Sequence, residues 1–459
     1  MTTKQFTYKR VEKNADLLTP VSIFKRLKGT KKFLLESSFQ HETKGKYSYI
    51  GANPYLEIIG NGNETKTIDL TTGEENSFEM PALDYMKEHL PYIETDIPLS
   101  FTGGAIGYVS YDVVRQFIDV GAELPNDLAM PDIHFMVYDT IIAYEHRTEK
   151  AHIIAMNVHD ESEATIDEKI DRISDELNEL VHIPEPTNGS LTFSPEMDEA
   201  TFIEKVVAAK QFIENDEAEQ IVLSQRMVAD VTCDPFSFYR HLRSKNPSPY
   251  MFYIDFNDYL IIGSSPESLV QTNGREVITN PIAGTRPRGT SGSEDAKLQA
   301  DLLADKKELA EHEMLVQLSK DDLLSICDSE SIEVPVYMDV VKYEHVMHIV
   351  SEVHGTLREG LSSIDALTAC LPAGTVSGSP KERAMQIINE LETVRRGVYA
   401  GGIGFVSFSH DINLAITIRS LVIKDEKAYL QVGAGIVKDS VPESEFAETL
   451  QKARSLTDI

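Results

Sequence analysis

Runs of β-branched and aromatic residues recur along the whole chain, and they constrain its fold more than any other feature. They are KKFLLES, KYSYIGANPYLEIIG, IHFMVYDTIIAYE and KAHIIAMNV in the first half, and QIVLSQRMVADV, YMFYIDF and YLIIGSSPE further on. Such runs, bounded by turn residues, predict β-strands. Helical patterns lie among them at 295–325 and 381–396, and a further helix is expected with Ser194 as its cap and Pro195 as its first residue. Because strands and helices do not alternate strictly, we expect an α+β fold and not a doubly wound sheet.

One segment divides the chain by composition. Residues 159–190 are acidic and polar and end in IPEPTNGS, which is typical of an exposed helix followed by a linker. We therefore expect an N-terminal β-rich domain over residues 1–185 and a second domain over residues 191–459. The length of 459 residues is compatible with one large domain or with two to three smaller ones.

The charge balance limits the partners of the chain. Lys and Arg total 43 against 74 Asp and Glu, a formal net charge of -31, which disfavours nucleic acid and anionic membrane surfaces. The three cysteines, Cys233, Cys327 and Cys370, show no pairing pattern, and no apolar run is long enough to span a bilayer. We expect a cytoplasmic enzyme with no membrane segment.

Two pairs of glutamates are spaced three residues apart in helical contexts. Glu308 and Glu311 lie in KKELAEHEMLV, and Glu445 and Glu448 lie in SEFAETLQKA, so each pair projects from one helix face. Most glutamates at this spacing form a solvated face, and neither pair alone establishes a site. If the pairs converge, however, a divalent cation must offset their repulsion, and oxygen ligands without nearby cysteine suit Mg²⁺.

Three glycine-rich segments, NPIAGTRPRGT, CLPAGTVSGSPKERAM and VGAGIVKDS, could bring backbone N–H groups close to an anion, although ordinary turns would look the same. The chain contains neither a P-loop nor G-x-G-x-x-G, so a nucleotide site has no support. Arg419 follows an apolar strand, where its guanidinium needs a carboxylate from protein or substrate. These patterns alone predict a magnesium-dependent enzyme that acts on a small anion.

Taken together, the segments resemble the chorismate-utilising enzymes, most closely the large subunits of anthranilate synthases. The motifs that carry the resemblance occur in family order: SSPES, PIAGTRPRG, AEHEML, VMHIVSEV, LPAGTVSGSPKERAM, VYAGGIGF, IRS, GAGIV and DSVPESEFAET. The resemblance covers nearly the whole chain. It implies two large antiparallel sheets packed together with helices outside, and an active site lined by the C-terminal region.

The resemblance also implies a role for each candidate residue. The four glutamates would hold Mg²⁺ directly or through water, and the ion would bind the ring carboxylate of chorismate. The remaining residues divide into a substrate-binding group, Thr285, Tyr399, Arg419, Gly433, Gly435 and Lys452, and a catalytic group, Glu267, His348, Thr375 and Gln220. Glu267 would protonate the departing C4 hydroxyl, which requires a raised pKa, and His348 would assist proton transfer during aromatisation.

Two positions indicate which member of the family this is. Relatives that add water use a lysine base where this chain has Gln220, and an amide cannot serve as that base. Aminodeoxychorismate synthases often carry a nucleophilic lysine where this chain has Ala283. Direct addition of ammonia at C2 of chorismate, followed by loss of the C4 hydroxyl and of pyruvate, is therefore the favoured reaction, and its product is anthranilate.

Two further segments resemble the tryptophan feedback site of anthranilate synthases. LLES places Leu35, Glu36 and Ser37 there, with Glu36 expected to hold the amino group, and NPSPYMF places Pro249, Tyr250 and Met251 around the indole. A buried strand and a proline-rich turn would be the purely structural explanation. None of the cysteines resembles a glutaminase nucleophile, so we expect a separate glutaminase subunit to supply ammonia within a hetero-oligomer.

Two alternatives stay open at this point. The nearest is component I of aminodeoxychorismate synthase, with a para product, and the other is a non-catalytic tryptophan-sensing subunit. The second is motivated by one departure from the family: the segment usually written G-R-N-D-L-G reads SKDDLL here, residues 319–324. The arginine fork is lost at Lys320, although no residue assigned to chemistry is affected.

Overall fold

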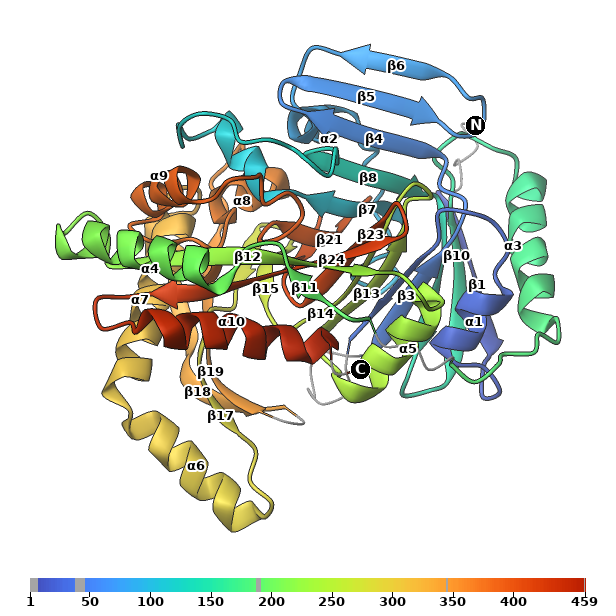
Figure 1. Ribbon diagram of the computed structural model, residues 1–459. Coiled ribbons are helices and arrows are strands. Elements are labelled where there is room, and N and C mark those ends of the chain that lie inside the picture. Colours follow the sequence, from blue (N-terminus) through green and yellow to red (C-terminus); the bar gives the residue numbers. More distant parts are fainter. Residues whose placement is uncertain (1–6, 38–45, 187–190, 344–345, 458) are drawn as a thin grey trace.

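The computed structural model describes residues 7–37, 46–186, 191–343, 346–457 and 459, and within them the chain forms two antiparallel sheets of twelve strands each (Figure 1). This confirms the predicted α+β class and the predicted pair of large sheets with helices outside. All seven predicted strand runs contain strands. No helix of the described residues is long and apolar enough to cross a membrane.

The first sheet runs from β1 at one end to β11 at the other. Its strands, in spatial order, are β1 (Tyr8–Asn14), β10 (Lys150–Met156), β9 (Thr140–Glu145), β3 (Tyr47–Gly51), β2 (Phe33–Glu36), β13 (Tyr250–Asp255), β14 (Leu260–Ser265), β23 (Ser420–Lys424), β24 (Lys427–Ile436), β12 (Gln220–Asp230) and β11 (Ser194–Pro195), with β20 (Gly378–Ser379) also paired to β12.

The second sheet runs from β17 to β6. Its strands, in spatial order, are β17 (Ile282–Pro287), β19 (Val346–Thr356), β16 (Glu276–Thr279), β15 (Ser268–Asn273), β22 (Ile412–Ile416), β21 (Gly402–Ser407), β7 (Gly104–Val109), β8 (Ile133–Tyr138), β4 (Leu56–Asn61), β5 (Glu64–Asp69) and β6 (Glu75–Phe78), with β18 (Glu333–Lys342) also paired to β19.

The central strands are buried on both faces, which explains why their sequences read as continuous apolar runs. Side chains alternate between faces along a strand. In β2, Phe33 packs into the core between the sheets, and the next residue, Leu34, packs into the core under the outer helices. In β14, Ile261 and Ile262 divide in the same way.

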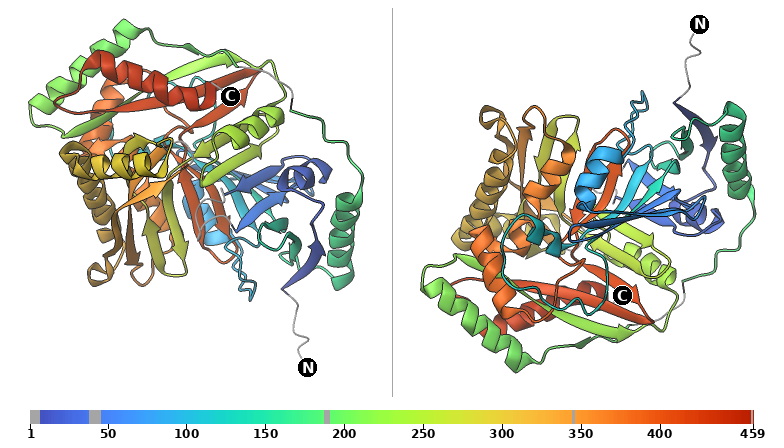
Figure 2. Two further views of the ribbon diagram at one scale, coloured as in Figure 1. Left: turned by 90° about the horizontal axis from the view of Figure 1, so that it is seen from below. Right: turned by 90° about the horizontal axis from the view of Figure 1, so that it is seen from above.

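Helices cover the outer faces and the ends of the sheets. They are α1 (Pro20–Arg26), α2 (Ala82–His89), α3 (Glu163–Asn178), α4 (Glu199–Glu214), α5 (Pro235–Lys245), α6 (Gly292–Ala304), α7 (Lys306–Leu324), α8 (Ser363–Cys370), α9 (Lys381–Leu391) and α10 (Pro442–Thr457), with short 3-10 turns η1 (Tyr111–Gln116), η2 (Ser329–Ser331) and η3 (Gly374–Val376). Figure 2 shows α3 at the opposite end of the molecule from α4 and α10. Helix α3 packs on β10, whereas α4, α9 and α10 pack on β12 and β24.

Three predicted helix boundaries are wrong. Ser194 caps no helix, because it pairs with Val228 as part of the edge strand β11; α4 begins at Glu199, where Asp198 accepts a hydrogen bond from the Thr201 amide at 2.8 Å. The predicted helix at 295–325 is two helices, since Asp305 ends α6 and caps α7. The helix at 381–396 stops at Leu391.

The expected division near residue 185 falls on the connection between α3 and β11, whose last residues, 187–190, lie outside the described part of the chain. Both sheets contain strands from either side of it: β2 pairs with β13, and β7 pairs with β21. The division thus separates two stretches of sequence that share both sheets, and as a domain boundary it stays a prediction.

Candidate active site

Two corners of the chain, where it crosses from one sheet to the other, carry charged residues. Glu267 lies between β14 of the first sheet and β15 of the second, and Arg419 lies between β22 and β23 in the reverse direction. The corners are bonded to each other: the Ile416 amide donates to the Glu267 carbonyl at 3.0 Å, and the Ser264 amide donates to the Arg419 carbonyl at 3.0 Å. The fold therefore places an acidic and a basic residue from sequence-distant segments at adjoining corners of the chain.

Glu267 is a buried carboxyl with an unusual protonation equilibrium. Burial raises its pKa from 4.5 to about 8, and interactions with the Thr375 side chain, the Ile282 backbone and the Lys452 ammonium offset only part of that rise. The carboxyl therefore carries a proton at neutral pH. This meets the requirement that the sequence placed on a general acid at this position.

Arg419 is a cation without a protein acceptor. Among the residues that the structure describes, its guanidinium makes no ion pair and donates no hydrogen bond, and burial lowers its pKa. Its backbone has a φ of 50°, a left-handed conformation that non-glycine residues rarely adopt. Tyr399 and Glu448 lie near enough to offset the burial in part. A desolvated guanidinium of this kind is suited to an anionic ligand.

His348 lies on β19 against the glycine-rich loop of β17. Its Nδ1 is 3.1 Å from the Gly284 carbonyl and 3.0 Å from Thr285 Oγ1. Because a carbonyl oxygen only accepts, the proton belongs on Nδ1, and Nε2 keeps its lone pair. Burial lowers the pKa of the imidazole to about 4, so the ring is neutral at pH 7 and can accept a proton.

The two glutamate pairs project from different helices towards the same space. Glu308 and Glu311 lie on α7, and Glu445 and Glu448 lie on α10. Burial raises the pKa of both Glu311 and Glu445, and the Lys307 ammonium of α7 lowers both. A single lysine acting on carboxyls of two helices indicates that the pairs face one another.

Each pair already has a cationic neighbour. Arg286 of β17 donates to Glu308 at 3.2 Å, and Lys452 lies 2.8 Å from Glu448. In the described part of the chain, no three acidic, histidine or cysteine side chains gather closely enough to form a ready metal cluster. Mg²⁺ does not require one, since it binds through one or two carboxylates, keeps several waters and takes ligands from its substrate. The oxygen donors thus fit Mg²⁺, and the metal assignment stays a prediction.

A glycine-lined strand completes the site. A Cβ on Gly433 of β24 would lie 2.6 Å from the Tyr399 hydroxyl, and one on Gly435 would lie 2.8 Å from Gln220 Nε2. A side chain at either position would displace the Tyr399 hydroxyl or the Gln220 amide, so the two glycines allow these close approaches. Gln220 Nε2 donates to Glu311 at 3.1 Å, and Lys452 Nζ donates to the Gly433 carbonyl at 2.9 Å.

These contacts bring together the candidate residues, which the sequence places in ten separate segments. Thr375 lies in η3 beside Glu267, and Thr285 lies beside His348. One residue of the site was missed: Lys307, which acts on both glutamate pairs. Arg286 belongs to the glycine-rich loop that the sequence offered as a candidate anion site, but its ion pair with Glu308 was not expected.

The segment 319–324, which departs from the usual family sequence, still contacts the glycine-rich segment that carries Thr375 and Lys381. Asp322, the fourth residue of this segment, accepts from Lys381 Nζ at 2.5 and 2.7 Å and so ties α7 to the start of α9. Burial raises the pKa of the Asp322 carboxyl, and the Lys381 ammonium counters that rise. The substitutions on either side of Asp322 therefore do not disconnect the helix that carries Glu308 and Glu311.

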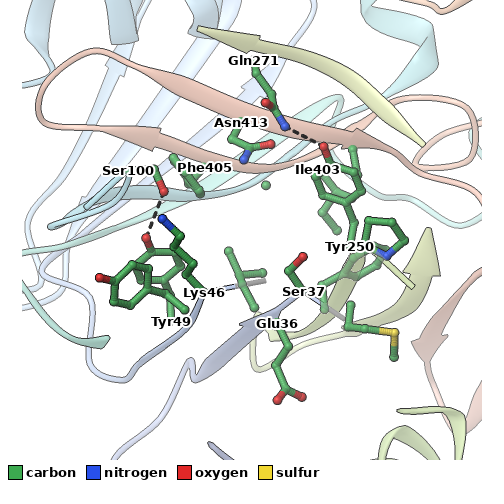
Figure 3. A pocket seen from close by; sticks show the side chains of 17 residues that line it. Glu36, Ser37, Lys46, Tyr49, Ser100, Tyr250, Gln271, Ile403, Phe405 and Asn413 are labelled. Atoms are coloured by element: carbon green, nitrogen blue, oxygen red, sulfur yellow. Dashed lines mark hydrogen bonds between the residues drawn. The ribbon is translucent and has the colours of Figure 1, made fainter. Parts of the chain in front are cut away.

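A cavity of about 310 Å³ lies between the sheets, away from these residues (Figure 3). All six residues of the predicted regulatory group, Leu35, Glu36, Ser37, Pro249, Tyr250 and Met251, line it. The rest of its wall includes residues of strands β21 and β22, among them Phe405 and Asn413, together with Lys46, Tyr47, Tyr49, Ser100, Phe252 and Gln271. No local pattern identified these additional residues, because they are distant in sequence.

The carboxylate of Glu36 is engaged outside the centre of this cavity. It accepts from Tyr239 at 2.6 Å and from Arg243 at 2.8 Å, and Figure 3 shows it pointing away from the other labelled side chains. The expectation that this carboxylate holds an amino group therefore does not match its observed partners. The Asn413 Oδ1 atom, by contrast, is buried in the cavity wall with no partner among the described residues.

Comparison with known proteins gives a consistent picture. The family model described as chorismate binding enzyme matches residues 30–458. Anthranilate synthase component 1 of Lactococcus lactis is 43% identical over 97% of this chain and 98% of its own, and that of Acetivibrio thermocellus is 41% identical over 97% and 93%.

Solved structures agree with the sequence relatives. The crystal structure of anthranilate synthase component I from Streptococcus pneumoniae is similar over the full length of both chains, with a TM-score of 0.83 and 38% identity. The menaquinone-specific isochorismate synthase of Escherichia coli, at 18% identity and a TM-score of 0.73 over 99% of this chain and 96% of its own, shares the fold.

The protonated state of Glu267 predicts a measurable pH dependence of stability. Its folded pKa of about 8 exceeds its ordinary value of 4.5, so between these values only the native state binds the proton. Stability from this group is fully present below pH 4.5 and is lost as the pH rises towards 8. Relative to Glu267→Gln, the free energy of unfolding of the parent should fall by about 1.4 kcal/mol per pH unit in that window. Urea unfolding from pH 5.5 to 7.5 measures this, and parallel curves for the two proteins would exclude the raised pKa.

Proposed function

Because this chain belongs to the chorismate-binding enzyme family, we propose that it is the large subunit of an anthranilate synthase, a lyase that converts chorismate and ammonia into anthranilate and pyruvate in tryptophan biosynthesis. The observation that carries the proposal is a buried, proton-bearing Glu267 and the unpaired guanidinium of Arg419 at adjoining corners of the chain, near two glutamate pairs. Relatives that are 40–43% identical to this chain are named anthranilate synthase component 1.

The substrate is a dianion, and the site offers a cation for each carboxylate. Arg419, with the Tyr399 hydroxyl beside it, takes the enolpyruvyl carboxylate, and Lys452 with the Gly435 backbone takes the ring carboxylate. Two anchored carboxylates fix the orientation of the ring against the catalytic groups. Glu308, Glu311, Glu445 and Glu448 would hold Mg²⁺, which when bound draws electron density towards the ring carboxylate and eases departure of the C4 oxygen.

The proton transfers follow from the two perturbed pKa values. Ammonia adds at C2 of the ring as the C4–O bond breaks, and Glu267 gives its proton to the leaving oxygen, so that water departs and not hydroxide. The ammonium formed at C2 returns a proton to the Glu267 carboxylate. His348 Nε2 then takes the C2 proton as the C3–O bond breaks, and the ring becomes aromatic. The departing enolpyruvate takes that proton on its methylene carbon and leaves as pyruvate. Thr375 and Thr285 line the ring and contact these two groups.

We propose ammonia as the nucleophile and C2 as the position of attack because Gln220 and Ala283 replace the lysines that other members of the family use. Gln220 donates to Glu311 and cannot deprotonate water, which argues against isochorismate and salicylate formation. Ala283 offers no amine to attack the ring, which argues against aminodeoxychorismate synthesis, the second candidate. The full set of anchors argues against a non-catalytic sensing subunit.

The name component 1 carried by the relatives implies a partner component. We propose that this partner is a glutaminase that supplies ammonia from glutamine within a hetero-oligomer. The large subunit alone then works with free ammonium. The cytoplasm is the proposed location, since the three cysteines are free thiols, as a reducing compartment keeps them.

The cavity between the sheets is proposed as a tryptophan feedback site. Ser37 and the unpartnered Asn413 Oδ1 can accept from the ammonium or the indole N–H, Lys46 can pair with the carboxylate, and Tyr250 and Met251 can pack on the ring. Tryptophan inhibits only if it binds more tightly to a state of the enzyme with lower affinity for substrate or lower turnover.

Product identification tests the function directly. Purified protein, chorismate, magnesium and ammonium should yield fluorescent anthranilate and stoichiometric pyruvate, because the site supports amination at C2. A para-aminated product would establish the second candidate. Absence of turnover in a folded protein would support the sensing subunit and overturn the proposed reaction.

The metal assignment predicts that Glu311→Gln abolishes activity. The variant keeps the size of the side chain and removes one of the charges that hold Mg²⁺, so kcat/KM should fall by more than about 100-fold, the range lost with a metal ligand or its support. Glu313→Gln, an exposed change two residues further along α7, is the matched control and should retain full activity. Magnesium titration by calorimetry gives a second readout, and unchanged binding in Glu311→Gln would contradict the assignment.

The feedback site predicts desensitised variants. Asn413→Ala and Ser37→Ala each remove an acceptor for a charged or N–H group, so the tryptophan concentration for half-inhibition should rise at least about 10-fold. Turnover without tryptophan should be unchanged, because neither side chain belongs to the catalytic site. Asn76→Ala on the exposed strand β6 is the control. Inhibition that stays unchanged in both cavity variants would place the tryptophan site elsewhere.

A further inference from the structure

A buried ion pair lies directly behind the proposed active site. Glu392, at the end of α9, accepts from Arg396 Nε at 2.9 Å and from Arg396 Nη2 at 2.6 Å. The two side chains are 6% and 1% exposed. A fully buried, bidentate pair requires partners for its remaining donors and acceptors, and those partners identify what the pair does.

The remaining donors of Arg396 reach two segments that carry site residues. Nη1 donates to the Val376 carbonyl at 2.7 Å, one residue after Thr375, and Nη2 donates to the Val222 carbonyl at 2.7 Å, two residues after Gln220. The planar guanidinium has a fixed fork, so these bonds also fix the separation of η3 from β12.

The face of the same guanidinium contacts a third site segment. Its central carbon lies 4.7 Å from the ring centroid of Tyr111 and 5.7 Å from that of Tyr399. Tyr399 is the residue whose hydroxyl meets Gly433. Arg396 thereby contacts the segments that hold Thr375, Gln220 and Tyr399. Of the groups proposed to contact substrate, it meets only the Tyr399 ring.

Glu392 is itself fixed to the first sheet. Its Oε1 accepts from the Ser224 amide at 2.9 Å and from Ser224 Oγ at 2.8 Å, and Gln431 of β24 donates to that hydroxyl at 2.8 Å. The carboxylate thus holds Arg396 in register with both β12 and β24, the strands that carry Gln220 and Gly433.

We propose that Arg396, oriented by Glu392, is a positioning residue that keeps Gln220, Thr375 and Tyr399 in their relative places for the reaction. This rests on the proposed function. Buried ion pairs are weak contributors to stability compared with apolar residues of the same size, so a purely stabilising role does not require this one. A single fork that spans three site segments is instead suited to setting their geometry, and displacements of about 1 Å can cost about 100-fold in rate.

The test compares Arg396→Lys with a matched control, Arg226→Lys. Arg226, on β12, is a second buried arginine and is paired with Asp127 and with Glu196 at 2.6 Å. Its guanidinium lies over the Tyr429 ring of β24, and its side-chain contacts in the described part of the chain include none of the proposed site residues. Lysine keeps the charge in both variants and loses the fork. Steady-state kinetics with chorismate and ammonium are measured at a temperature at which both are folded by circular dichroism, together with hydrogen exchange of residues 374–379.

Arg396→Lys should lose about 10- to 100-fold in kcat/KM and should speed exchange in residues 374–379, while Arg226→Lys keeps the parent values for both, whatever its loss in Tm. Equal effects of the two variants, or no effect of Arg396→Lys, would overturn the proposal. An inactive parent would instead refute the proposed function, and hydrogen exchange would still report whether Arg396 fixes the loop.

If Arg396→Lys does not fold, Glu392→Gln serves in its place. The amide oxygen can keep the three bonds that Oε1 accepts, and only the bond from Arg396 Nε is lost. This milder variant should lose about 3- to 10-fold in kcat/KM, as one weakened bond implies, with the same local rise in exchange. Parent kinetics together with parent exchange would overturn the positioning role.

Discussion

The hydrogen bonds between the two crossing corners are the constraint on which the rest of the site depends. Ser265 Oγ donates a hydrogen bond to the Ile416 carbonyl at 2.7 Å, and two hydrogen bonds from backbone amides join the same corners. Because β14 and β23 are neighbours in one sheet while β15 and β22 are neighbours in the other, the chain must leave the first sheet and return to it at the same place. Glu267 and Arg419 occupy those exits. The other elements of the site pack around these two corners. They are helices α7 and α10, the loop at Thr375 and the strand that carries His348.

The electrostatics of the site offset the repulsion that the net negative charge of the chain exerts on an anionic substrate. A chain with a formal charge of -31 has to admit a dianion. Glu267 is neutral at pH 7 and adds no repulsion. Arg419 makes no ion pair with a carboxylate of the described residues, and Lys452 reaches both Glu448 and the glycine-lined strand. Burial of Glu267 and Arg419 lowers the free energy of unfolding, and the same burial gives Glu267 the protonated state that the proposed chemistry needs.

Much of the fold could be predicted from sequence because the central strands are buried on both faces and therefore read as apolar runs. Helix starts were harder: both Ser194 and Asp198 are good caps, and strand pairing of Ser194 with Val228 decided between them. The break at Asp305 has a local cause, since its carboxylate caps Lys307 and Glu308, but helical spacing on both sides concealed it. The site residues were found through ordered motifs. The ion pairs of Glu36 and Glu308 depend on tertiary contacts that no local pattern encodes.

The sandwich also gives the proposed feedback site a physical route to the catalytic residues. The cavity has one wall from β2 and β13 of the first sheet and the other from β15, β21 and β22 of the second. Strand β22 carries Asn413 and Ala415 at the cavity and leads directly to Arg419. A ligand that changes the spacing of the sheets at the cavity therefore acts on the strand that leads to Arg419, the proposed substrate anchor. Packed sheets do not deform continuously, so such a ligand would select between discrete arrangements, and its effect is limited by its difference in affinity for them.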